Sequence, residues 1–329
     1  MVKVSSTLSI SELRRLGEEA LSEITKHGQL VIEPVFKVLN KDLADTANRV
    51  KVFYVNFADK YRKGKITFGE GLRSYLTING VENLARYLTL TASILSSVRI
   101  IRVTKFYDSI RSVDDDMIKF INNPVKDNGV KLAEEFTKNY GEVDFKQVND
   151  AIKNYALSLR AVARRGGLAK EFAVIRNYIS LENFIRSFMT PYSTVHRNKS
   201  VRIMIRWIAH ESGAPLALKV MLRGQNKLYI PVGDMYTASA VIRSGAYLVL
   251  IDDDRVKTLY INLSRGNEVK IPYKVARFIA VKTIRRSSDP IAAEKGAYDI
   301  GFNCVNNQCT DCPIDGYCSK FTSFTITLD

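Results

Sequence analysis

The sequence predicts a mainly α-helical protein with a small β insertion and a four-cysteine loop near its C-terminus. Three observations predict this fold class. Apolar residues recur at helical spacing over most of the chain, β-branched and aromatic residues gather in residues 247–273, and every cysteine lies in residues 304–318. At 329 residues, 46% of them hydrophobic, the chain is long enough for about two domains with packed cores.

The N-terminal region, residues 1–190, consists of helical patterns and carries no motif that indicates a role. Its first helix is opened by the cap-like Ser9. Further helices are expected over Pro34–Tyr61, 81–110 and 130–163, with the polar segment 113–128 between the last two.

A turn-prone segment at residues 190–194 gives the preferred domain boundary. It leaves residues 191–303 as a second helical domain and residues 304–329 as the cysteine loop and tail. Helices in this part are expected over 198–209, 235–244, 274–286 and 291–300, and residues 247–273 form the β insertion.

Positive charge is concentrated in one stretch of the chain. The net charge is +15, and the stretch from Arg160 to Arg206 contains ten basic residues and only two acidic ones. Such a stretch suits a polyanion, although a solvated surface would explain any single residue in it. The predicted helix 198–209 would carry one apolar and one cationic face. The residues expected to contact nucleic acid there are Arg197, Lys199, Arg202 and Arg206.

One aspartate stands at the start of a predicted helix. Asp234 directly precedes the predicted helix 235–244, where an N-cap residue belongs. Its carboxylate would face free backbone N–H groups and the positive end of the helix dipole. Capping alone would also explain an aspartate at this position.

The four cysteines, Cys304, Cys309, Cys312 and Cys318, follow the spacing C-x4-C-x2-C-x5-C. Disulfides are one alternative, but nothing in the sequence marks secretion, and dense cysteines in a reducing compartment more often hold metal. Structural zinc sites usually combine two C-x2-C-like knuckles, whereas only one such pair is present. A single local loop with three unequal gaps favours a [4Fe–4S] cluster over zinc.

These elements together resemble the C-terminal half of the helix-hairpin-helix DNA glycosylases of the endonuclease III and adenine glycosylase type. The chain is most similar to an uncharacterised branch of that superfamily. Three segments carry the resemblance, which covers about residues 184–318: NKSVRIMIRW (198–207), IPVGDMYTASAVIRSG (230–245) and DPIAAEKGAYDIGF (289–302), the last leading into the cysteines.

The resemblance implies a glycosylase-like helical domain closed by an iron–sulfur loop. By position, Asp234 would be the catalytic carboxylate of base excision repair, and the four cysteines would bind the cluster. Two features depart from the family. Residues 209–222 lack its phosphate-binding hairpin motif, and neither Lys219 nor Lys227 occupies the position of its lyase lysine. A monofunctional DNA N-glycosylase that uses Asp234 and water is therefore the catalytic hypothesis.

We thus expect a soluble, intracellular (cytoplasmic) protein that binds DNA or RNA and has no membrane partner. The competing hypothesis is a non-catalytic nucleic-acid-binding protein whose four-cysteine site, iron–sulfur or zinc, is purely structural.

Overall fold

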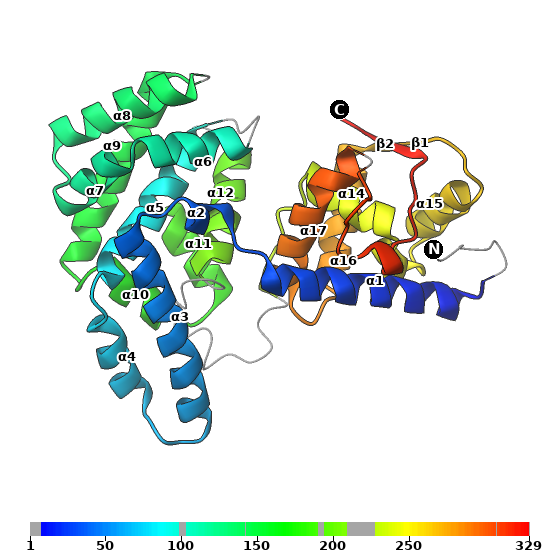
Figure 1. The fold of residues 1–329 in the computed structure, drawn as a ribbon, viewed down its shortest axis with the longest axis horizontal. Helices are drawn as coiled ribbons and strands as arrows, with labels where there is room; N and C mark the ends of the chain where they lie inside the picture. The colour runs from blue at the N-terminus through cyan, green and yellow to red at the C-terminus, as the bar shows by residue number, and fades with distance from the viewer. Residues whose placement is uncertain are drawn as a thin grey trace. The chain divides into compact units, whose positions relative to one another are not determined.

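The structure is a computed structural model that describes residues 8–98, 103–141, 143–189, 194–208, 228–306 and 308–328. Within these ranges the chain is mainly helical and contains one two-stranded sheet (Figure 1), which confirms the predicted fold class at this level. None of the described helices combines the length and the apolar character that crossing a membrane would require.

The chain divides into two compact units. The first combines Met1–Val31 with Asn226–Asp329, and the second is Ile32–Gln225. This division differs from the sequence-based boundaries at residues 190 and 303. It assigns the N-terminal helix to the unit that carries the cysteines, and the helix expected over 198–209 to the other unit.

The second unit is built around α5 (Val81–Ser97), which is buried along most of its length and packs against α3, α9 and α12. The other helices of this unit are α2 (Pro34–Lys37), α3 (Lys41–Arg62), α4 (Phe68–Leu76), α6 (Val103–Ser112), α7 (Asp114–Asn122), α8 (Lys126–Tyr140), α9 (Phe145–Ala163), α10 (Leu168–Val174), α11 (Tyr178–Arg186) and α12 (Thr194–Arg206).

Two expectations for this unit are corrected. The single helix expected over Pro34–Tyr61 is two helices, because Asn40 caps α3 by accepting a hydrogen bond from the backbone N–H of Leu43. The polar segment 113–128 is not a separator. Its three aspartates occupy the first turn of α7, where negative charge favours a helix start.

The first unit is held together by α1 (Ile10–Leu30) packed along α17 (Pro290–Val305). A Cβ on Gly28 would lie 1.8 Å from the carbonyl oxygen of Ala292, and a Cβ on Gly296 would lie 2.1 Å from that of Ile24. The two backbones can approach so closely only because both residues are glycine. The unit's other elements are α14 (Met235–Ser244), η3 (Ala246–Leu250), α15 (Asp254–Ser264), β1 (Val269–Pro272), α16 (Tyr273–Ile284), η4 (Asp315–Tyr317) and β2 (Phe324–Thr327).

The β insertion predicted over residues 247–273 is largely wrong. The segment forms the 3-10 helix η3 and the helix α15, and only β1 is a strand. Asp253 caps α15. The buried residues of α15 recur at helical spacing: Val256, Leu259, Tyr260 and Leu263. β1 pairs in parallel with β2, which lies beyond the cysteines. The sequence pattern therefore gave the right apolar residues and the wrong period.

Candidate functional site

Asp234 is the N-cap of α14, as the sequence predicts. Its Oδ1 accepts hydrogen bonds of 3.1 Å from both the backbone N–H and the hydroxyl of Thr237. The residue is only 8% exposed. The carboxylate is therefore held at a fixed position, at the positive end of α14.

A buried glutamate that the sequence interpretation missed supports the segment before Asp234. Glu294, on α17, is fully buried and accepts hydrogen bonds from the Tyr229 hydroxyl and from the backbone N–H groups of Val232 and Gly233, the last at 3.2 Å. Gly233 has a φ of +61°, and a Cβ there would lie 2.6 Å from Val281 Cγ2. The backbone that delivers Asp234 is thus fixed by a buried carboxylate on one side and by close packing against α16 on the other.

Two further side chains reach this segment from α16. The Tyr273 hydroxyl donates to the carbonyl oxygen of Gly233 at 3.5 Å, and Arg277 Nε donates to that of Val232 at 3.1 Å. Burial, and next the negative charge of Asp234, raise the pKa of Tyr273. Asp234 is therefore electrostatically coupled to a phenol that stays protonated at neutral pH.

The four cysteines gather at the C-terminal end of α17 and in the loop that follows. All four are free thiols; Cys304 and Cys318 are buried, whereas Cys309 and Cys312 are partly exposed. Burial raises the pKa of Cys304 to about 12 and that of Cys318 to about 11, and the charges of the neighbouring cysteines add to both shifts. The thiols are therefore close enough to repel one another when ionised.

Whether these residues fit a metal centre can be judged from their chemistry and geometry. Among the described residues, no group of three His, Cys, Asp or Glu side chains is arranged to hold a metal ion. A single zinc ion would need its sulfurs about 2.3 Å from one point, whereas a cubane spreads its four ligands over four iron atoms. The backbone N–H of Lys320 donates to Cys318 Sγ at 3.4 Å, a contact of the kind that tunes cluster sulfurs. The four thiols supply sulfur donors of the kind that both structural zinc and iron–sulfur clusters take.

The cysteine loop is attached to the same helix that begins at Asp234. The backbone N–H groups of Ser319 and Phe321 donate to the carbonyl oxygens of Ser244 and Arg243, at 3.0 and 3.1 Å. Arg243 is buried, and its charge counteracts the rise in the pKa of Cys304. Helix α14 therefore carries Asp234 at one end and the cysteine loop at the other, about 15 Å away for ten residues.

Among the side chains that the structure describes, the basic residues predicted on α12 do not form an exposed cationic face. Arg206 is 4% exposed and forms an ion pair with the equally buried Glu33, with 2.9 Å between Nε and Oε1. Lys199 and Arg202 are half-buried, and the side chain of Arg197 lies outside the described residues. Residues 203–208 are buried all round the helix. The sequence had predicted that Arg206 contacts nucleic acid, whereas the structure buries it in the core of the second unit.

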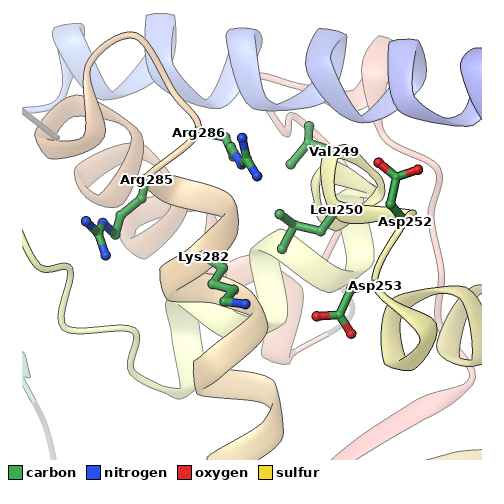
Figure 2. Close-up of a pocket in the computed structure, with 7 residues that line it drawn as sticks. All are labelled: Val249, Leu250, Asp252, Asp253, Lys282, Arg285 and Arg286. Carbon is green, nitrogen blue, oxygen red and sulfur yellow. The ribbon is translucent and has the colours of Figure 1, made fainter.

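In the first unit, a group of exposed cations lies along α16. This helix borders a cavity of about 500 Å³ that is lined by Val249, Leu250, Asp252, Asp253, Lys282, Arg285 and Arg286 (Figure 2). Asp234 lines neither this cavity nor three other cavities in the described parts of the chain. The cations beside this cavity and Glu294 are the residues that the sequence interpretation overlooked.

Comparison with known proteins gives no match: no family model, no curated protein and no solved structure matches the chain. The assignment of a function therefore depends on the residues and geometry described above.

Proposed function

We propose that this chain is a nucleic-acid-binding iron–sulfur protein of the helix-hairpin-helix glycosylase type, with Asp234 as its catalytic carboxylate. The observation that carries the proposal is the organisation of α14. One short helix begins at a fixed, buried aspartate and ends against a loop that gathers four thiols.

In this proposal the cluster ligands are Cys304, Cys309, Cys312 and Cys318. Bound there, an iron–sulfur cluster would cross-link the loop to the end of α17. Arg243 would lie beside the thiolates and offset their negative charge, consistent with its effect on the pKa of Cys304.

The chemistry proposed for Asp234 is hydrolysis of an N-glycosidic bond. The oxygen of a water molecule bonds to the sugar carbon, and the base leaves with the electrons of the broken bond. Positive charge builds up on the sugar, where the Asp234 carboxylate stabilises it. The attacking water gives up a proton to Asp234 or to solvent, and the departing base takes up a proton from solvent. The target base would first have to leave the stack. Glu294 and Tyr273 position Asp234 through the backbone of Val232 and Gly233 and do not touch the substrate.

A second candidate function is nucleic-acid binding without catalysis, with the cysteine loop as a purely structural metal site. One observation favours it: Asp234 is a well-formed cap and lines none of the cavities described above. Capping would then be its whole role.

The discriminating experiment measures base release from a panel of damaged and mismatched duplexes at low salt. Asp234→Asn removes the charge and keeps a good capping residue. Asp289→Asn is the matched control, because Asp289 caps α17 of the same unit by accepting from the backbone N–H of Ala292. Release by the wild type and by Asp289→Asn, but not by Asp234→Asn, supports catalysis. No release from any duplex by protein that binds DNA supports the second function.

A further inference from the structure

Helix α16 has the cationic face that the sequence had predicted on α12. Between Tyr273 and Arg286 the chain contains five basic residues and no acidic one. These residues, all exposed, are Lys274, Arg277, Lys282, Arg285 and Arg286. The opposite face is buried through Ala276, Ile279, Ala280 and Ile284. Four of the cations lie on one side of the helix, because Arg277, Lys282 and Arg285 follow Lys274 by three, eight and eleven positions.

The N-terminal end of this helix lies at the candidate site. Arg277 contacts the carbonyl oxygen of Val232, and Tyr273 is coupled to the charge of Asp234. The cationic face therefore begins beside Asp234.

The C-terminal end borders the cavity of about 500 Å³. Figure 2 shows Lys282 extending toward Asp253 and Arg286 lying beside Val249. The two carboxylates of this cavity already form ion pairs with arginines that do not line it: Asp252 with Arg14 at 2.5 Å and Asp253 with Arg255 at 2.9 Å. Each carboxylate thus has an ion-pair partner outside the lining, and the lining itself contains three cations, Lys282, Arg285 and Arg286, against two carboxylates.

An adjoining cavity of about 580 Å³ shares Val249, Asp252 and Arg286 with the first. It adds the side chains of Ser22, Thr25, Ser287 and Ser288, together with Arg14, Leu21 and the carboxylate of Glu18. Guanidinium, ammonium and hydroxyl groups are the side-chain donors that proteins use to hold phosphate oxygens. Thr25 and Ser287 are buried and hydrogen-bonded to each other, whereas Ser22 and Ser288 are exposed. The end of α16 thus combines exposed cations with these two exposed hydroxyl groups in a concave surface.

From this arrangement we infer that α16 is the phosphate-binding surface of the first unit, along which a nucleic-acid strand runs from the cavity at Arg286 toward Asp234. The inference deepens the proposed function and rests on it. Twelve residues of helix span about 18 Å, a length that corresponds to about five nucleotide steps of 3.4 Å along one strand of a duplex. The cations hold the backbone and leave the base to the Asp234 end.

The test measures binding of fluorescently labelled duplex and single-stranded DNA and of RNA to the full-length protein, over a series of salt concentrations. The variant is Lys282→Gln/Arg285→Gln/Arg286→Gln. Its matched control is Arg160→Gln/Arg164→Gln/Arg165→Gln, which removes three exposed arginines from the basic stretch of the second unit. Anionic lipid vesicles form a separate arm.

We expect the α16 variant to bind roughly ten-fold or more weakly, and its plot of log K against log salt to flatten by about 2 to 3, since each lost phosphate contact removes about 0.7 to 0.9 of slope. The control should stay within about two-fold of the wild type. The single variant Arg286→Gln should lower the slope of log K against log salt by about 1. This variant keeps the test valid if the triple variant does not fold.

Wild-type affinity and slope in the α16 variant would overturn the inference and leave the proposed function standing, because the protein would still bind nucleic acid elsewhere. Binding to the vesicles alone, or no binding of the wild type to any nucleic acid in dilute buffer, would overturn both.

Discussion

The buried carboxylate of Glu294 accepts a hydrogen bond of 3.2 Å from the backbone N–H of Gly233, the residue immediately before Asp234. It also accepts hydrogen bonds from the backbone N–H of Val232 and from the hydroxyl of Tyr229. Three donors therefore bind one carboxylate that is buried from solvent. The geometry of the candidate site therefore depends on a residue of α17 about 60 positions away in the sequence.

Glu294→Gln should lower the free energy of unfolding by about 1 to 3 kcal/mol, because an amide N–H₂ group would replace one of the accepting oxygens and leave buried donors unsatisfied. The measurement is denaturant unfolding followed by circular dichroism. Glu268→Gln, at an exposed glutamate of the same unit, is the control and should change stability by less than about 0.5 kcal/mol. Equal stability of the two variants would mean that Glu294 does not hold this segment.

The ion pair between Arg206 and Glu33 makes a separate prediction for the second unit. Arg206→Met alone should cost about 3 to 5 kcal/mol, because it leaves the Glu33 carboxylate buried without its ion-pair partner. The double variant Arg206→Met/Glu33→Leu should recover most of that loss, since it removes both charges from the core. A double-mutant cycle of unfolding free energies checks this. A single variant as stable as the wild type would place Arg206 at the surface after all.

The raised thiol pKa values predict a pH dependence for metal-free protein. In the unfolded chain a cysteine titrates near 9.0, whereas in the folded state burial raises the pKa of Cys304 to about 12 and that of Cys318 to about 11. The folded state therefore binds these protons more tightly. Their contribution to stability is fully present below about pH 9 and is lost as the pH rises toward 11 to 12.

Urea unfolding of chelator-treated protein across this alkaline range measures the effect. Cys304→Ala/Cys318→Ala is the comparison, because its stability should fall less steeply with pH over the same range. Parallel pH profiles for the two proteins would contradict the assignment to these thiols.

Features fixed by local sequence were predicted well. The caps at Ser9 and Asp234 were both expected, and both accept hydrogen bonds from the first turn of their helices. Capping depends on residues within three or four positions, and this pattern is visible in the sequence.

Features that depend on distant contacts could not be predicted in this way. Glu33 lies 173 positions from Arg206, and β1 pairs with a strand beyond the cysteines. Helical periodicity places Arg206 on a polar face, but it does not reveal a carboxylate that packs against that face. For the same reason the sequence around Glu294, in the largely apolar first half of α17, did not indicate that its carboxylate would bind the backbone before Asp234. The basic residues of α16 can be read from the sequence, but their proximity to Asp234 is seen only in the structure.

The central claim is that α14 joins a candidate catalytic aspartate to a cluster-binding loop. Iron, acid-labile sulfide and zinc analysis of protein purified without oxygen tests it most directly. The account predicts a coloured protein with about four iron and four sulfide per chain, and loss of both in Cys318→Ser. A colourless preparation, with zinc or with no metal in stoichiometric amount, would contradict it.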